Sequence, residues 1–142
     1  MSIQISLTEI LNSLKIEEGF RGRAYRCSEG HLTVGYGRNI DKTGLGLTEE
    51  EASYLLKNDV VRTVEELRRR YIWFDSIPKK QREVLVELCF QLGASRLSQF
   101  KKMLHNFEEG NYYAAADELL DSKFAREQVP ARADRLANKL RG

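Results

Sequence analysis

Apolar and polar residues first alternate at helical spacing, over residues 6–18. Ile10, Leu11 and Leu14 recur three and four positions apart, which is the spacing of one face of an amphipathic helix. A serine or threonine precedes the pattern, and such residues often cap the start of a helix. Gly19 follows it, and glycine is typical of the left-handed residue that ends a helix. The pattern therefore predicts a first helix that ends at Gly19.

After this helix the spacing changes to that of β-strands. Aromatic and β-branched residues in the segments 24–27 and 31–37 lie on both sides of a Ser-Glu-Gly turn. Strand-forming residues around a short turn predict a β-hairpin. We expect residues 39–46 to form a loop.

Helical spacing returns for the rest of the chain. Thr48 is followed three residues later by Glu51, a capping box that predicts the start of a helix of about 20 residues. Pro78 marks the next helix start. We expect one face of that helix to be buried, with Val84, Leu85, Leu88, Cys89 and Leu92 on it. Two or three shorter helices are predicted over residues 100–107, 112–120 and 130–140.

These elements predict an α+β fold in which the β-structure is confined to the first third of the chain. We expect one domain, residues 1–142, in three parts. An N-terminal helix and small β-lobe occupy about residues 1–47, a linking helix residues 48–70, and a helical lobe residues 71–142. Clefts form readily between two such lobes.

The composition excludes several classes of protein. The 142 residues are 42% hydrophobic and 31% charged with a net charge of +2, which is ordinary for a globular protein and argues against nucleic-acid binding. Arg68–Arg70 is more typical of a solvated helix end, where cations complement the helix dipole. Two histidines and two separated cysteines match neither zinc spacing nor a disulfide framework. We therefore expect no metal, no cofactor and no nucleic-acid partner.

The chain also lacks the signals of export. Its N-terminus has no basic start followed by an apolar run, and no stretch approaches the roughly 20 apolar residues of a membrane span. We expect synthesis in the cytoplasm without a signal peptide, and no stable membrane insertion.

Glu18 is the first candidate for chemistry. It lies at the C-terminal end of the predicted first helix, where the helix dipole disfavours a negative charge. A carboxyl group held protonated is what a general acid requires. The alternative is an ordinary surface glutamate at a frayed helix end.

Thr33 and Cys27 are further candidates in the hairpin. Thr33 shares a strand face with His31 and Gly35, and its hydroxyl could orient a water molecule if that face lines a cleft. The alternative is a threonine on a solvated face. Cys27 has polar neighbours, which favours partial exposure. A Cys27–His31 nucleophile pair is conceivable, but nothing else in the chain supports a cysteine hydrolase.

Residues 17–37, EEGFRGRAYRCSEGHLTVGYG, resemble the opening motif of the phage-type lysozymes, the endolysin family that includes T-even phage lysozyme. That motif has a glutamate followed by glycine, a second residue nine positions after the glutamate, and a threonine six positions later. Here these positions hold Glu18, Cys27 and Thr33. Further segments resemble the family in the same order along nearly the whole chain: Phe-Gln-Leu-Gly at residues 90–93, Phe100, Tyr-Tyr-Ala-Ala-Ala at residues 112–116, and Pro-Ala-Arg-Ala at residues 130–133.

The resemblance implies a lysozyme-like fold and a muramidase. Such an enzyme cleaves the β-1,4 bond from N-acetylmuramic acid to N-acetylglucosamine in peptidoglycan, and family members are taken to invert the anomeric configuration. Glu18 would protonate the glycosidic oxygen, while Cys27 and Thr33 would hold the attacking water. The resemblance also implies that Arg132 pairs with Glu18, and that the saccharide cleft is lined by Glu29, Phe90 and Gln91.

Cys27 departs from the best-known member of the family, which has aspartate there, although the wider family also accepts cysteine. A thiol at its ordinary pKa is mostly neutral at pH 7 and is a poor general base. Three roles stay open. A thiolate could stabilise the oxocarbenium-like transition state, the residue could only place the water, or a glycosyl-thioether could form with retention. A thiolate exposed in a cleft would also be sensitive to oxidants.

The resemblance finally implies how the protein meets its substrate. We expect a monomer that binds peptidoglycan glycan strands, and that reaches the wall through a membrane pore made by a holin. Acting in the periplasm on the cell wall, it would be bacteriolytic. Alternatives are a lysozyme-fold module that binds peptidoglycan without cutting it, and a domain of a phage tail or toxin.

Overall fold

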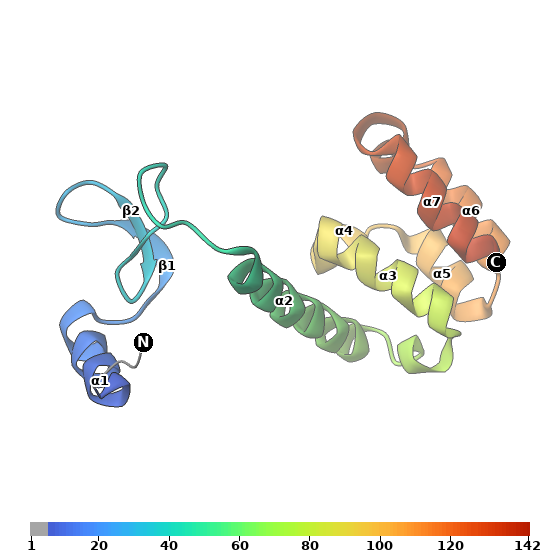
Figure 1. The fold of residues 1–142 in the computed structure, drawn as a ribbon. Coiled ribbons are helices and arrows are strands. Elements are labelled where there is room, and N and C mark those ends of the chain that lie inside the picture. The colour runs from blue at the N-terminus through green and yellow to red at the C-terminus, as the bar shows by residue number, and fades with distance from the viewer. Residues whose placement is uncertain (1–5) are drawn as a thin grey trace. The chain divides into compact units, whose positions relative to one another are not determined.

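The computed structural model describes residues 6–142. The chain folds into two compact units, Met1–Ser53 and Tyr54–Gly142. Figure 1 shows the first unit as one helix and a small sheet, and the second as a group of helices. The α+β fold and the confinement of the strands to the first third of the chain are confirmed.

The first helix, α1 (Leu7–Glu18), has the predicted bounds. The side chain of Ser6 accepts a hydrogen bond from the backbone N–H of Glu9 at 3.3 Å, which caps the helix start. Gly19 ends the helix, and its N–H donates to the carbonyl of Lys15 at 3.0 Å. Its φ of 70° is positive, but its ψ of 148° lies outside the left-handed helical region that we predicted. The chain thus turns sharply into the first strand directly after Glu18.

A three-stranded antiparallel sheet of order β1-β2-β3 follows. The predicted hairpin is confirmed as β1 (Arg21–Arg26) and β2 (Leu32–Gly35), with Tyr25 opposite Thr33. A short third strand, β3 (Arg38–Asn39), pairs with β2 and was not predicted. Because β3 is only two residues long, it carries too little alternation to be recognised in a sequence.

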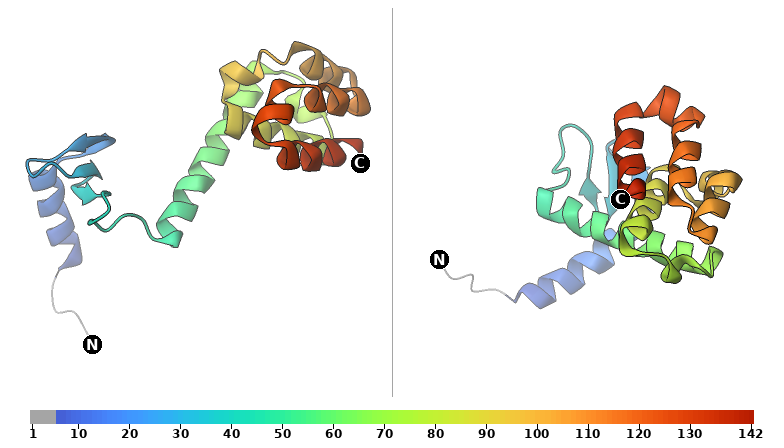
Figure 2. Two further views of the ribbon diagram at one scale, coloured as in Figure 1. Left: turned by 90° about the horizontal axis from the view of Figure 1, so that it is seen from above. Right: turned by 90° about the vertical axis from the view of Figure 1, so that its right-hand side faces the viewer.

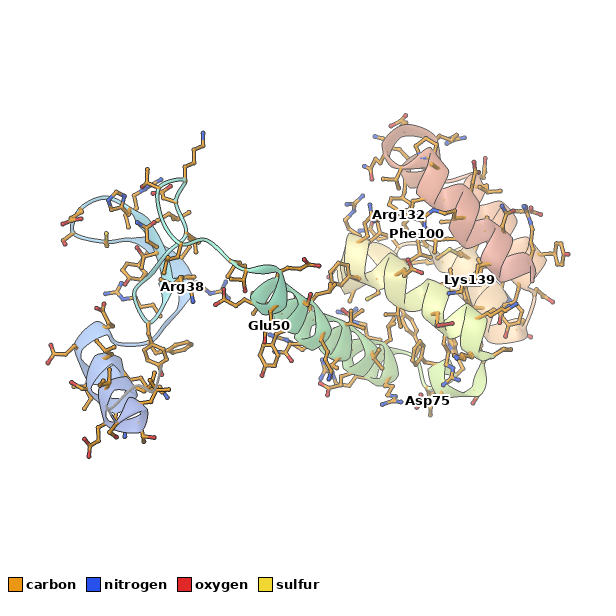
Figure 3. All side chains as sticks on the ribbon, in the orientation of Figure 1. Arg38, Glu50, Asp75, Phe100, Arg132 and Lys139 are labelled. Carbon is orange, nitrogen blue, oxygen red and sulfur yellow. The ribbon has the colours of Figure 1, made fainter. Side chains whose placement is uncertain are left out.

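The linking helix α2 (Glu49–Arg70) begins in the first unit and continues in the second. The capping box that predicted its start is present. The N–H of Glu51 donates to the hydroxyl of Thr48 at 3.1 Å, and the carboxylate of Glu51 accepts from the N–H of Thr48 at 2.9 Å. The same carboxylate pairs with Arg38, which Figure 3 labels beside the sheet, at 2.6 Å. The helix start is therefore joined to the strand β3.

The second unit is built around α3 (Lys79–Leu92), which starts after Pro78 as predicted. It packs against α7 (Pro130–Arg141), and α6 (Tyr112–Leu120) lies between α7 and α5 (Lys101–Glu109) in contact with both. Figure 2 shows this group of helices from two further directions. All five residues of the predicted face of α3 are buried, and Cys89 lies among them as a small apolar side chain.

Three short segments of the second unit were not predicted. They are η1 (Phe74–Ser76), α4 (Ala94–Leu97) and a turn of π-helix, η2 (Phe124–Gln128). Each is five residues or shorter, so helical periodicity does not develop within it. Within residues 6–142, none of the helices combines the length and the apolar character that a bilayer crossing needs.

Candidate active site

Glu18 is the last residue of α1, and its carboxylate lies against the backbone of Gly37. A Cβ atom on Gly37 would lie 2.5 Å from the Oε2 atom of Glu18 and 2.9 Å from its Cδ atom. Gly37 also has a φ of +69°, which L-residues with a side chain rarely adopt. Glycine at position 37 therefore allows both the turn after β2 and the close approach of the acid. The Glu18 side chain is exposed, so its carboxyl group is open to a ligand.

Cys27 is the first residue after β1, at the start of the hairpin turn. Its N–H donates to the carbonyl of His31 at 2.9 Å, and its own carbonyl accepts from the N–H of Gly30 at 2.8 Å. The side chain is half-buried and its thiol is free. The turn thus presents the sulfur at the end of the sheet, where two backbone hydrogen bonds hold residues 27–31.

The surroundings of Cys27 favour its thiolate form. Hydrogen bonds from the backbone N–H of Glu29 and from that of His31 lower the pKa of the Cys27 thiol below its ordinary value. Partial burial and the charge of Glu29 act in the opposite direction. The effects that lower the pKa of Cys27 outweigh those that raise it. The thiol at this position is therefore closer to a negatively charged group than an isolated cysteine would be.

Thr33 lies in β2 and is only 3% exposed, so the alternative of a threonine on a solvated face is wrong. Its hydroxyl donates to the carbonyl of His31 at 2.9 Å. A hydroxyl has one proton, and here that proton is used by a carbonyl. The oxygen of Thr33 keeps its lone pairs, which can accept a hydrogen bond from a water molecule. In the hairpin, Thr33 pairs with Tyr25, two residues before Cys27, and the joint role of Cys27 and Thr33 stays a prediction.

Glu29 and His31 are the remaining polar side chains of the turn. Their side chains lie 3.8 Å apart, measured from Oε2 to Nε2, and both are partly exposed. The imidazole therefore faces a carboxylate, while Cys27 receives the backbone N–H of His31. This arrangement disfavours the Cys–His nucleophile pair. It leaves Glu29 available at the surface beside the thiol.

The other predicted site residues lie in the second unit. Phe90, on α3, is 46% exposed and lines a hollow of about 550 Å³. Arg132, labelled on α7 in Figure 3, donates to the side-chain carbonyl of Gln91, and both residues line a smaller hollow of about 370 Å³. Glu18 and Arg132 belong to different units. The pairing of these two residues stays a prediction.

Sequence reasoning missed the residues that support this turn. Asp41 accepts a hydrogen bond from the backbone of β2 and faces Arg26. The spacing of Asn39 and Asp41 around a loop was a usable signal, because such residues bond to nearby backbone. Within residues 6–142, no group of three or more histidine, cysteine or carboxylate side chains is placed to hold a metal ion.

Comparison with known proteins agrees with the motif. The phage lysozyme family model matches residues 15–137. The endolysin of Salmonella phage P22 is 34% identical over 83% of this chain and 82% of its own length. A probable T4-type lysozyme 2 of Dictyostelium discoideum is 26% identical over 92% of each chain. An endolysin of Acyrthosiphon pisum secondary endosymbiont phage 1 is 26% identical over 75% of this chain and 72% of its own.

Proposed function

Since the chain belongs to the phage lysozyme family, we propose that it is a muramidase. It would hydrolyse the β-1,4 bond from N-acetylmuramic acid to N-acetylglucosamine in peptidoglycan. One observation carries the proposal. The exposed carboxyl group of Glu18 is held against Gly37, in the turn between β2 and β3, and the hairpin of the same sheet carries Cys27 and Thr33. Inverting glycoside hydrolysis needs a general acid and a group that activates the attacking water.

Glu18 is the proposed general acid. It is the last residue of a helix of 12 residues, directly before the chain turns into β1. The protonated group would donate its proton to the glycosidic oxygen as the bond to the sugar breaks. Its exposure and its support by Gly37 suit a group that must reach a polymer without being fixed in a core.

Cys27 and Thr33 are proposed to act on the attacking water. The hydroxyl of Thr33 donates its proton to the carbonyl of His31, and its oxygen would accept a hydrogen bond from that water. Cys27, with its lowered pKa, would supply negative charge near the oxocarbenium-like transition state. An inverting reaction needs its two catalytic groups about 6.5–9.5 Å apart, so that a water molecule fits between them and the sugar. We propose this inverting course for the enzyme.

Substrate binding is proposed to use residues of both units, which would work together as one lysozyme-like domain. Glu29 beside the thiol and the exposed ring of Phe90 offer a polar group and an apolar platform to a sugar. Gln91 and Arg132 are proposed to line the saccharide site, with Arg132 placing Glu18. Phe90 is the clearest candidate of the second unit, since an exposed aromatic ring beside a hollow suits the apolar face of a pyranose.

The protein is proposed to be an endolysin. It would act as a monomer on peptidoglycan glycan strands in the periplasm, after a holin opens the membrane, and would need neither a cofactor nor nucleic acid. A second function is favoured by one observation, the thiol at position 27 in place of a second carboxylate. That function is a module that binds peptidoglycan and cuts it weakly or not at all.

The test is to identify the new reducing ends. Purified peptidoglycan is digested under reductant, the products are reduced with borohydride, and the terminal sugar is identified by mass spectrometry. Reduced muramic acid at the new ends supports a muramidase, while reduced glucosamine would show that a different bond is cut. If no ends form and the protein still sediments with peptidoglycan, the binding module is correct.

A further inference from the structure

Arg26 and Asp41 join the two sides of the turn that carries Cys27. Arg26 precedes the turn, and its Nη1 atom donates to the carbonyl of Gly30 at 3.0 Å and lies 3.7 Å from Oδ2 of Asp41. The same Oδ2 atom accepts the backbone N–H of Leu32, directly after the turn, at 2.7 Å. Arg26 and Leu32 are opposite each other in the sheet. One carboxylate oxygen therefore contacts both ends of the turn.

Asp41 is itself held in place by its loop. Its N–H donates to the side-chain oxygen of Asn39 at 2.9 Å, and its carbonyl accepts the N–H of Gly44 at 2.9 Å. Gly44 lies so close to Asn39 that no Cβ atom fits on it. The N–H of Ile40 donates to the carbonyl of Leu32 at 2.9 Å. The loop is thus a built structure that presents one carboxylate to the hairpin.

The geometry of the peptide bond connects this pair to the thiol. The carbonyl of Gly30 and the N–H of His31 belong to one planar peptide unit and point in opposite directions. Arg26 fixes the carbonyl of that unit. Hydrogen bonding from the N–H of the same unit is one cause of the lowered pKa of the Cys27 thiol. Fixing one end of the unit therefore fixes the direction of the other.

A contribution to folding stability does not explain why Arg26 and Asp41 pair. The side chain of Arg26 is 67% exposed and that of Asp41 35% exposed, and ion pairs so open to water add little to folding. We propose that Arg26 and Asp41 are positioning residues for Cys27, which hold the turn so that the N–H groups of Glu29 and His31 face its sulfur. Only the catalytic consequence rests on the proposed function. The effect on the thiol can be measured without any enzyme assay.

The test is the pH profile of Cys27 alkylation by iodoacetamide in Asp41→Ala and Asp41→Asn. Trypsin places Cys27 and Cys89 on different peptides, so mass spectrometry reads the two thiols separately and Cys89, which is buried, serves as an internal control. Asp41→Ala removes the bond to Leu32 and the contact with Arg26. Asp41→Asn keeps an oxygen for Leu32 and removes the charge. It therefore tests the positioning role even if the alanine variant does not fold.

The direction in which the alkylation rate of Cys27 changes separates a positioning role of Asp41 from a simple effect of its charge. Loss of a nearby negative charge alone would favour the thiolate of Cys27 and speed alkylation. Loosening the turn would weaken the hydrogen bonding of the N–H groups to the sulfur and would slow alkylation. The charge of Glu29 acts on the Cys27 thiol. Glu29, His31 and Arg26 are the other charged or titratable side chains of this turn, and all three stay unchanged in these variants.

We expect alkylation of Cys27 at neutral pH to slow by about fivefold in Asp41→Ala, the factor that the loss of one ordinary hydrogen bond gives. The profile should move to higher pH, and Asp41→Asn should change it in the same direction by less. Asp75→Asn is the matched control, since Asp75 pairs with Arg68 at 2.9 Å in the second unit. Unchanged or faster alkylation in folded Asp41→Asn would overturn the proposal.

Discussion

Replacing Gly37 by alanine should separate the position of Glu18 from the stability of the sheet. The new Cβ atom would lie 2.5 Å from Oε2 of Glu18, which is closer than non-bonded atoms approach. The atom it meets is the far end of a flexible side chain, so the carboxylate would swing away. The collision should therefore cost little folding free energy, but it should move the proposed acid out of place.

The backbone cost can be estimated separately. Gly37 has a φ of +69°, and an alanine in that region costs about 1–2 kcal/mol. Gly46 has a φ of +60° in the same unit, and a Cβ atom on it would meet nothing within 4 Å. Gly46→Ala should thus lose the same 1–2 kcal/mol, which is roughly 3–8 °C in Tm for a chain of this size. Only Gly37→Ala should also move the proposed acid, and a displacement of about 1 Å can cost about 100-fold in rate.

The assay is the initial rate of peptidoglycan hydrolysis, with Tm measured on the same samples. We expect a similar Tm for the two variants, near-normal activity for Gly46→Ala and about 100-fold lower activity for Gly37→Ala. Equal activities in the two variants would refute the idea that contact with Gly37 places the acid. A much lower Tm for Gly37→Ala alone would show that the collision is relieved by the backbone rather than by Glu18.

Three further predictions concern the hairpin. Cys27→Asp should keep activity and abolish inhibition by thiol reagents and oxidants; an inactive but folded variant would show that sulfur has a role of its own. Thr33→Ala should cut the rate by more than about tenfold. It should also lower the free energy of unfolding by about 1 kcal/mol, for the lost hydrogen bond to His31. If Thr33 is purely structural, the variant will lose stability with little loss of rate. The pH at which alkylation of Cys27 levels off in the folded wild type should be lower than in the urea-unfolded chain, since the turn lowers the thiol pKa; identical profiles would contradict the hydrogen bonds of the turn.

Most of the fold could be predicted because its signals are local. The capping box at Thr48 and Glu51, the start of α3 after Pro78 and the buried face of that helix all follow from residues close in sequence. The strand β3 could not be predicted, because a two-residue strand is defined by its partner β2 rather than by its own composition. The φ and ψ of Gly19 could not be predicted either, since many turns need a positive φ.

The sequence suggests candidate residues for the site but not the contacts that they make. The resemblance to the phage-type lysozymes proposed Glu18, Cys27 and Thr33, yet the burial of Thr33 and its bond to His31 depend on how the hairpin pairs. The lowered pKa of Cys27 depends on the direction of two backbone N–H groups, which spacing does not encode. Asp41 lies 14 residues after Cys27, and only the folded loop brings it to the turn.

The most direct measurement is reducing-end release from purified peptidoglycan, under reductant, by the wild type and by Glu18→Gln side by side. Glutamine keeps the size of the side chain and cannot donate the proton, so the variant should fold with unchanged Tm and release nothing above background. Release by the wild type alone would establish a glycosidase with Glu18 as its acid. Activity of the folded variant above a few per cent of wild type would contradict that assignment.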